Sequence, residues 1–399
     1  MEFLRKLRKY RIFRYTPANP LDGWEFSAAM LERFCGHIGI SLFKRSHNLF
    51  NFLFVFPICN FIIYGFSVFI TTYRFRDDIT KVIHCLTTLG FASQAIMKIY
   101  SFIITRKEVI DINETNHKFY RTMMKQSDRV KGVLCENIGL IYIVSRLAAI
   151  AYMVLELTVL IIPAVSSSLR ITEPLLPFGY FFPFIDPDTL PGYLWNYVFQ
   201  LLISAYYWYI TVSTDIQTIY NLLTACGQLD VLMTLIDELN EDLANGKPQA
   251  MIKGKIIEII QLHQQHREYL DRVVQFLNLY HLVAVGCSVL AMVISVLGLV
   301  LLDWYPGIAM VFLGSSQLFY VCFLGTSLDI KLDELTEKAG AVCWDKLSVV
   351  EMKYMKLVLA MSQKPKVLLV ATAPLNMNAF VQIHKMIYSM VMMLRNTKD

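Results

Sequence analysis

A chain of 399 residues that is 55% hydrophobic and only 17% charged, with a mean hydropathy of +0.46, lies outside the range of soluble globular proteins. The net charge of +5 does not indicate nucleic acid, because the basic residues gather in short segments between apolar runs and no nucleic-acid-binding module is recognisable. The composition therefore predicts an all-α protein that crosses a membrane several times.

Residues 1–47 form a basic segment before the first apolar run. The segment lacks the uninterrupted apolar core of a signal peptide, so we expect the first span to direct insertion into the membrane. Phe3, Leu4, Leu7 and Ile12 stand near helical spacing among basic residues. This pattern fits an amphipathic helix on the anionic inner leaflet, and it fits a solvated arm equally well.

Seven apolar runs of a length that can cross a bilayer follow. They cover residues 48–72, 79–105, 137–163, 193–216, 276–302, 307–328 and 374–395. Seven spans place the two termini on opposite sides of the membrane. The segments on the N-terminal side hold 28 Lys and Arg residues, against five on the other side. By the positive-inside rule we expect a cytoplasmic N-terminus and an extracellular C-terminus.

Helices are predicted to continue into the cytoplasm beyond the membrane. Residues 106–136 are charged and contain no proline, so we expect helical extensions of the second and third spans there. The helical pattern of the fourth span continues past Asp215 to a stop signal at residues 245–248 and resumes at Gln249. The sequence thus predicts two long helices joined by a tight turn. They form a cytoplasmic stalk over about residues 217–275, which extends from a six-helix membrane bundle of residues 48–328.

The outer loop, residues 164–192, is rich in proline and aromatic residues. Its prolines are Pro174, Pro177, Pro183, Pro187 and Pro191, and its aromatic residues include Phe178, Tyr180, Phe181, Phe182 and Phe184. Proline stiffens a loop because its ring fixes φ. A stiff aromatic loop above a helix bundle is typical of a lid over a small-molecule site, although a cap on the membrane surface would look the same.

Residues 329–373 are predicted to hold a cytoplasmic anchor helix. Ser348 and Glu351 form a capping-box pattern at its start, and Pro365 marks its end. Met352, Met355 and Leu359 share one side of this helix, so we expect it to pack against the stalk and against neighbouring subunits. The last region, 374–399, is the seventh span with a short extracellular tail. That span carries more polar groups than lipid on every side would allow.

Motifs of catalysis are not found in the sequence. It has no Gly-rich phosphate loop, no His-Glu-x-x-His and no Gly-x-Ser-x-Gly pattern. The eight cysteines match no metal-ligand spacing and fit packing residues in a reducing or lipid-buried setting. We therefore expect no enzyme activity, no cofactor and no metal.

Charged and histidine side chains inside the spans need a partner, water or a route to the surface. Lys98 and Asp215 lie near span ends, so we expect them to extend toward the membrane surface. Glu156 lies in the outer half of the third span and fits either a ligand pocket or an internal ion pair. His84, His281 and His384 fit neutral histidines hydrogen-bonded within the bundle, and His84 also stands where a ligand could reach it.

The C-terminal third carries a pattern of residues that resembles a known family. They are Trp344, the run from Ser362 to Pro365, the run from Pro374 to Asn376, Phe380, Ile383 and the pair Tyr388 and Ser389. Their order and spacing resemble the C-terminal signature of the insect odorant receptors, which are ligand-gated cation channels with seven spans and an inside N-terminus. Gustatory receptors end in a different pattern, because Ile387-Tyr388 and Leu394-Arg395 stand here in place of their Thr-Tyr and Gln-Phe.

The resemblance implies a ligand-tuned subunit and not the co-receptor, which has a longer insertion after its fourth span and Gln in the place of Leu394. Such subunits assemble with the odorant co-receptor as heterotetramers around a non-selective pore for cations. The implied location is the plasma membrane of a sensory-neuron dendrite, in contact with membrane lipids. The implied ligand is a small volatile odorant.

The resemblance also assigns the pore. An apolar gate near the outer end of the last span corresponds to Val391 and Leu394, and such constrictions close by dewetting. Helical spacing places His384, Ile387 and Tyr388 on the same broad face, although a small rotation would exchange them for neighbouring methionines. The alternative is that this face of the last span only packs within the bundle and does not line a pore.

The odorant pocket implied by the resemblance lies in the outer half of the bundle, between the second, third, fourth and sixth spans. The candidate residues are His84, Thr87, Thr88 and Phe91, Tyr152 and Glu156, Phe199, Ser204, Tyr206, Tyr207 and Trp208, and Phe312, Ser315 and Ser316. Aromatic walls with a few hydroxyl groups suit small, weakly polar molecules. Each of these residues could instead serve packing alone.

Three other functions remain open at the level of sequence. A gustatory-type receptor channel would share the topology. A G-protein-coupled receptor would have the opposite orientation and outside cysteines that tether its long loop. A transporter would show internal repeats or helices broken at the middle of the membrane, and neither is detected.

Overall fold

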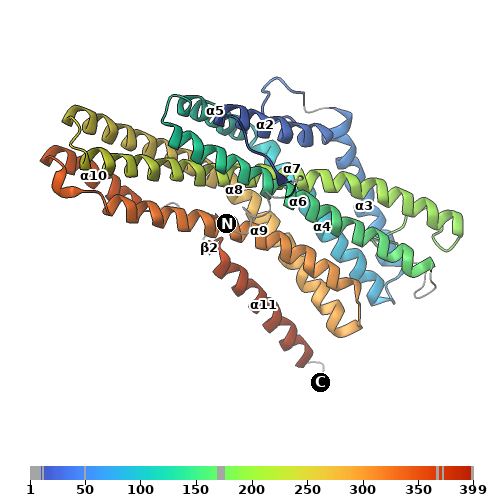
Figure 1. Cartoon of the computed structure of the whole chain (residues 1–399). Helices are drawn as coiled ribbons and strands as arrows, with labels where there is room; N and C mark the ends of the chain where they lie inside the picture. Colours follow the sequence, from blue (N-terminus) through green and yellow to red (C-terminus); the bar gives the residue numbers. More distant parts are fainter. Residues whose placement is uncertain are drawn as a thin grey trace.

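The computed structural model describes residues 10, 13–48, 51–168, 176–364, 368–370 and 373–396, and it is built almost entirely from helices (Figure 1). The helices are α2 (Pro20–His37), α3 (Phe52–Arg74), α4 (Ile79–Ile104), α5 (Arg106–Met123), α6 (Asp128–Ser168), α7 (Leu190–Ala244), α8 (Gln249–Leu302), α9 (Pro306–Gly340), α10 (Val349–Ser362) and α11 (Met377–Asn396). The short helix η2 (Trp344–Lys346) precedes α10, and the strands β1 (Leu369–Val370) and β2 (Ala373–Pro374) precede α11. The all-α prediction is confirmed.

Six helices of the described part are long and apolar enough to cross a membrane: α3, α4, α6, α7, α8 and α9. They correspond to the first six predicted spans, with α3 beginning four residues later and α4 ending one residue earlier than predicted. The seventh predicted span is α11, whose 20 residues reach about 30 Å. It is not among the six apolar helices. The polar side chains that the sequence showed in this segment account for the difference.

The stalk consists of two continuous helices, as predicted. Helix α7 has 55 residues and α8 has 54, so each is about 80 Å long. Between them Gly246 takes φ +64°, a left-handed conformation that suits glycine after a helix end. Helix α9 runs beside both, and α10 packs against α8 and α9 at the end of the molecule labelled in Figure 1. The predicted capping box between Ser348 and Glu351 is present.

Helix α2 was not predicted from the sequence. Asn19 caps it, because its side chain accepts a hydrogen bond of 2.9 Å from the amide of Asp22. Trp24, Ala28, Leu31 and Cys35 recur at helical spacing and are buried against α6 and α7. A further difference lies in the predicted extension of the second span, which ends at Ile104 and gives way to the separate helix α5. The proposed N-terminal amphipathic helix lies outside the described residues.

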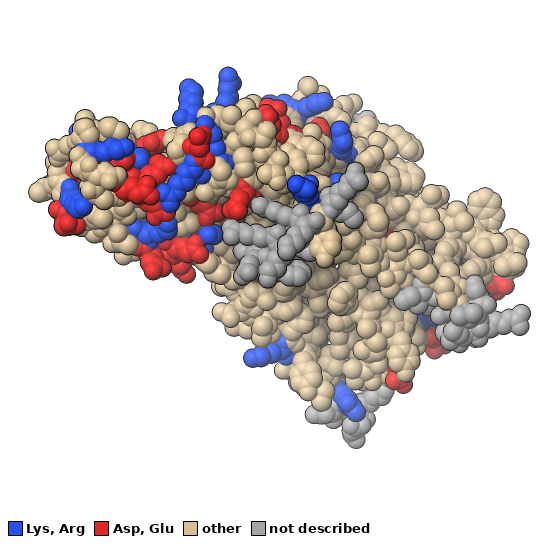
Figure 2. Space-filling model, in the orientation of Figure 1, with Lys and Arg blue, Asp and Glu red and all other residues tan. Residues whose placement is uncertain are grey.

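Charge divides the surface into two parts. Lys, Arg, Asp and Glu gather over the stalk, whereas the visible face of the remaining bundle is almost free of them (Figure 2). Large apolar side chains point outward from that bundle, among them Phe69 on α3, Val154 on α6 and Phe312 on α9. Such a surface suits contact with lipid and not with water. The charged stalk and the apolar bundle are thus distinct parts of one elongated molecule.

Helix α11 packs against both α8 and α9, and its polar and aromatic contacts are with α9. The amide of Met377 donates a hydrogen bond of 2.9 Å to Thr326 Oγ1, and Phe380 contacts the ring of Phe319 edge to face. Ser315 Oγ lies 3.0 Å from His384 Nε2. The ribbon of α11 is drawn apart from those of the other helices (Figure 1), but Ile387 and Val391 further along it are still buried. The two strands before it pair in antiparallel fashion, with Leu369 opposite Pro374.

Candidate functional site

A cavity of about 90 Å³ lies between α4, α6, α7 and α9, with α3 and the outer loop completing its wall. The lining residues are mostly aromatic or aliphatic: Tyr64, Thr88, Phe91, Ala92, Gln94, Ala95, Tyr152, Glu156, Val159, Phe178, Tyr180, Ile203, Tyr207, Trp208, Thr211, Met310, Leu313 and Gln317. An apolar protein cavity of about 150 Å³ can hold benzene. The cavity here is smaller, so it suits a molecule of about one ring only if its walls move apart slightly.

The outer loop forms one wall of this cavity through Phe178 and Tyr180. Gln200 on α7 holds the loop from one side, because its Oε1 accepts from the amide of Phe178 at 3.0 Å and its Nε2 donates to the carbonyl of Tyr180 at 2.6 Å. Thr88 on α4 donates to the carbonyl of Phe178 at 2.9 Å. Tyr64 donates to Thr88 at 3.0 Å and packs its ring on that of Tyr180. The loop is thus anchored to three helices.

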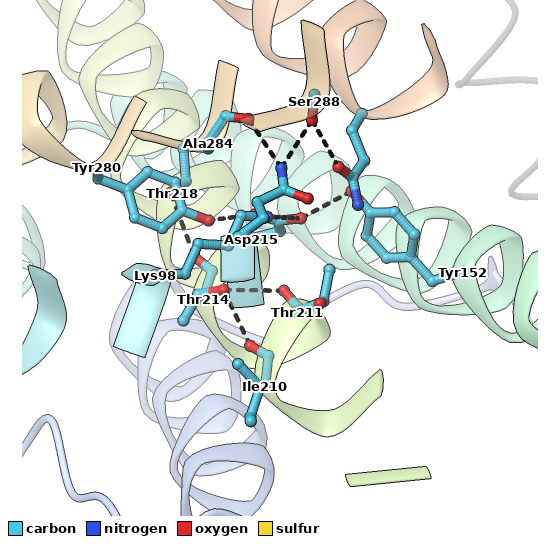
Figure 3. Close-up of polar contacts among 12 residues, drawn as sticks. Lys98, Tyr152, Ile210, Thr211, Thr214, Asp215, Thr218, Tyr280, Ala284 and Ser288 are labelled. Atoms are coloured by element: carbon cyan, nitrogen blue, oxygen red, sulfur yellow. Dashed lines mark hydrogen bonds and ion pairs between the residues drawn. The ribbon is translucent and has the colours of Figure 1, made fainter. Parts of the chain in front are cut away.

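A buried ion pair lies next to the cavity (Figure 3). Lys98 Nζ is 2.8 Å from Asp215 Oδ1, and their side chains are only 2% and 1% exposed. Tyr152 donates to Asp215 Oδ2 at 2.7 Å, and Tyr280 donates to Oδ1. The expectation that Lys98 and Asp215 extend toward the membrane surface is wrong, because each finds its opposite charge inside the bundle. Since Tyr152 also lines the cavity, the wall and the ion pair share one side chain.

A second polar chain connects the cavity wall to α8. Gln94 Nε2 donates to the carbonyl of Ala284 at 3.0 Å and to Ser288 Oγ at 2.8 Å. Ser288 in turn donates to Gln317 Oε1 at 3.2 Å. Gln94 and Gln317 both line the cavity, from α4 and α9. The cavity is therefore apolar over most of its wall and joined to hydrogen-bonded networks on one side.

Six of the predicted pocket residues line this cavity: Thr88, Phe91, Tyr152, Glu156, Tyr207 and Trp208. His84 and Thr87 are buried outside it, and His84 Nε2 lies 3.0 Å from the carbonyl oxygen of Pro177. Phe199 packs against Phe182 of the outer loop. Ser204 lies behind Glu156 and interacts with its carboxyl group.

The remaining pocket candidates turn away from the cavity. Tyr206 donates a hydrogen bond of 2.6 Å to the carbonyl of Leu53, and Phe312 is 63% exposed on the outside of α9. Ser316 donates to the carbonyl of Leu313, one turn before it on α9. Ser315 faces His384 of α11 instead.

Several residues of the cavity wall were not predicted from the sequence. Tyr64 belongs to α3, a span that was not assigned to the pocket. Gln94 and Thr211 lie about one turn beyond the last candidates on their helices, and Gln317 directly follows Ser316. Their polar side chains within apolar runs were a usable signal. A polar group in a span needs a partner or a cavity.

The predicted pore residues do not all share one environment within a single chain. Ile387 and Val391 are buried against the chain's own helices, and His384 is half-buried beside Phe380. Tyr388 is 66% exposed, and the neighbouring Met390 and Met393 are 46% and 63% exposed. The side chain of Leu394 lies outside the described residues.

No candidate metal site is found in the described part of the chain, where no group of three or more His, Cys, Asp or Glu is placed to hold an ion.

Known proteins resemble this chain in both sequence and fold. The family model described as 7tm Odorant receptor matches residues 78–388. The solved structure of the insect olfactory receptor OR5 from Machilis hrabei in complex with eugenol superimposes with a TM-score of 0.69 at 14% identity. The match covers 94% of this chain and 98% of that chain. The structure described without eugenol gives a TM-score of 0.67 at 15% identity, with the same coverage.

The two kinds of match support different conclusions. At 14% to 15% identity the OR5 structures establish a shared seven-helix fold and nothing about the ligand. The family model spans well over half of the sequence, including the cavity helices and most of α11. The family is one of receptors and not of enzymes, in agreement with the prediction from sequence. The chain belongs to the 7tm odorant receptor family.

Proposed function

We propose that this protein is a ligand-tuned odorant receptor subunit that binds a small volatile molecule in the cavity and gates a non-selective cation pore. The observation that carries the proposal is the aromatic cavity between α4, α6, α7 and α9, closed on one side by the outer loop. These are the second, third, fourth and sixth spans, from which the pocket was expected. An apolar cavity with a few polar groups is the usual form of a small-molecule site.

The proposed orientation places the stalk in the cytoplasm and the outer loop outside the plasma membrane of a sensory-neuron dendrite. The excess of Lys and Arg in the segments on the stalk side supports it. The concentration of charge over the stalk gives the same division (Figure 2). Ligands would then enter from outside, because the cavity lies beside the outer loop.

The proposed pore is formed by α11 from this chain together with α11 of an odorant co-receptor in a heterotetramer. The exposed side of α11 supports this assignment, because Tyr388 and Met390 lack contacts with the chain's own bundle that would cover them. Val391 and Leu394 remain the proposed gate, with His384, Ile387 and Tyr388 nearby. A turn of α11 about its own axis would bring Val391 from its buried position toward the pore.

The proposed mechanism transmits ligand binding through α9. On one side α9 lines the cavity with Leu313 and Gln317. On another side it contacts α11 through Ser315 and Phe319. A ligand shifts the pore toward opening only to the extent that it binds the open conformation more tightly than the closed one. A change of position of α9 is the simplest way to link these two states.

The test is expression in a heterologous cell with and without an odorant co-receptor, followed by recording during application of an odorant panel. We expect odorant-evoked cation current that requires the co-receptor and persists when G-protein turnover is blocked. Tyr207→Ala should change the odorant response, while an outward-facing change such as Phe69→Ala should not. A current that requires GTP turnover would indicate a G-protein-coupled receptor, and vectorial uptake of the ligand without current would indicate a transporter.

A further inference from the structure

Glu156 is the one acidic side chain among the described residues that line this mostly aromatic and aliphatic cavity. Among the described residues that line the cavity, none is Lys, Arg or His, so the wall supplies no cationic partner for it. The nearest buried ammonium group described above, that of Lys98, is already paired with Asp215. A carboxyl group in such surroundings is costly unless a hydrogen-bond donor satisfies it.

Several other polar groups of the wall are engaged with the protein itself, whereas the hydroxyl of Tyr207 and the indole nitrogen of Trp208 have no hydrogen-bond partner in the described structure. Thr88 and Tyr64 hold the outer loop, and the hydroxyl of Tyr152 donates to Asp215. Gln94 directs its amide nitrogen to Ala284 and Ser288. These side chains would have to break a bond before they could bind a ligand. The wall groups left open to a ligand are therefore the donors of Tyr207 and Trp208 and the carboxyl group of Glu156.

Glu156, by contrast, keeps acceptor capacity for a ligand. Its protein neighbour is Ser204, whose hydroxyl has a single proton. That proton can also go to the carbonyl oxygen of Leu201, 2.9 Å from Ser204 Oγ. A carboxyl group offers two oxygen atoms, and one shared hydroxyl cannot satisfy both. Since Glu156 lines the cavity, the remaining acceptor sites face the space where a ligand binds.

Building on the proposed function, we propose that the cavity selects small apolar molecules that carry a hydrogen-bond donor, either a hydroxyl or an amino group, and that Glu156 accepts this bond. The aromatic side chains Phe91, Phe178 and Trp208 enclose the apolar part of the ligand. Molecules of the same size that can only accept hydrogen bonds place an acceptor oxygen against an acceptor carboxylate and bind less tightly. Glu156 is thus the acceptor that sets the preference for a donor, while the hydroxyl of Tyr207 and the indole N–H of Trp208 are open to either kind of ligand.

The experiment compares four one-ring probes, small molecules that the cavity could admit after a slight movement of its walls. Benzyl alcohol and anisole are isomers, but only the alcohol donates a hydrogen bond. Toluene has neither function, and benzylamine carries a cationic donor. We expect benzyl alcohol or benzylamine to activate the receptor complex at concentrations about tenfold lower than anisole or toluene, the effect of one hydrogen bond of about 1.4 kcal/mol. The preferred donor tells whether Glu156 meets a neutral or a charged group.

Three variants of the receptor, recorded with the co-receptor present, connect the preference to Glu156. Glu156→Leu should abolish the preference of benzyl alcohol over anisole while keeping a response to toluene. Glu156→Gln should keep most of the preference, because its amide oxygen still accepts, and it serves where the leucine variant fails to reach the surface. Leu157→Ala, at an outward-facing position next along α6, is the matched control and should keep the wild-type order of probes.

The outcomes separate this inference from the proposed function. Equal responses to benzyl alcohol and anisole in the wild-type receptor would overturn the role of Glu156 and leave the odorant cavity intact. An unchanged preference in both Glu156 variants would do the same. Failure of the wild-type complex to respond to these probes and to a broad odorant panel, with the protein present at the surface, would instead contradict the proposed function.

Discussion

Helix α7 passes through two regions with different packing, and the difference separates stability from selectivity. From Leu190 to Tyr209 it alternates buried and exposed residues and borders the cavity. From Ile210 to Ile236 nearly every residue is buried, because α2, α4, α6, α8 and α9 all pack around it. In a closely packed region, a change in side-chain volume disturbs the neighbouring residues and lowers stability. In a wall beside empty space, the same change costs less stability. Substitutions in the second region should affect folding, and substitutions in the first should affect ligand choice.

The largest effect is expected at the junction of the two regions, where Asp215 pairs with Lys98. Asp215→Leu leaves a buried ammonium group and two tyrosine hydroxyls without their acceptor. We expect a loss of about 3 to 5 kcal/mol of stability. The measurement is the thermal unfolding midpoint of the purified protein in detergent. Adding Lys98→Met to the same chain should restore part of the loss, because it removes the unpaired charge.

A surface ion pair provides the control for this comparison. Lys81 lies 3.4 Å from Asp78, and both side chains are more than a third exposed. Lys81→Met should change stability by less than about 1 kcal/mol. If Asp215→Leu were as mild as this control, or if the double variant were worse than both single ones, the buried pair would not hold the junction together.

The sequence was informative about long helices and much less so about which side chains meet. The length of α7 followed from the absence of a helix breaker before Asn245, and the start of α10 followed from Ser348 and Glu351, because both signals are local. The pairing of Lys98 with Asp215 depends on how α4 and α7 rotate against each other. Rotation is set by packing among many helices, so no single segment reveals it.

The same reasoning explains which part of the cavity wall could be anticipated. Four lining residues could be predicted from their depth along the spans, because depth is a property of each helix alone: Phe91, Tyr152, Glu156 and Tyr207. Phe312 lies at the expected depth but on the outside of α9. Helix α2 was missed although the cap at Asn19 and the helical spacing of Trp24 and Leu31 were local signals, because only apolar runs long enough to cross a membrane were sought there.

The next effect contrasts one apolar truncation in each region. Leu232 is buried in the densely packed part of α7, so Leu232→Ala should cost about 2 to 5 kcal/mol. Phe91 already borders empty space, so Phe91→Ala should cost less stability and should admit larger odorants. Unfolding midpoints and dose-response curves for ligands of increasing size measure the two effects. Equal loss of stability with no change in ligand size would contradict the division.

A smaller effect is expected where α7 approaches α6 at a glycine. A Cβ atom on Gly227 would lie 2.6 Å from Asn137, whose Nδ2 donates to the carbonyl of Leu223 at 2.9 Å. Gly227→Ala should therefore cost about 1 to 3 kcal/mol through overpacking. Gly254 on α8 has no atom within 4 Å of such a Cβ. Gly254→Ala is the matched control and should be neutral or slightly stabilising, because alanine favours helix.

The smallest effect tests whether the stalk can be weakened without a change in selectivity. Ser348 accepts a hydrogen bond from the amide of Glu351, and Glu351 accepts one from the amide of Ser348. Ser348→Ala removes half of this capping box and should lower stability by about 1 kcal/mol. Because α10 packs on α8 and α9 far from the cavity, the order of potency among benzyl alcohol, anisole and toluene should stay as in the wild type. Glu156→Leu should show the converse, with little change in unfolding midpoint and a new order of potency. If Ser348→Ala reordered the ligands, the stalk and the cavity would be coupled through the long helices, and the two regions of α7 would have to be treated as one.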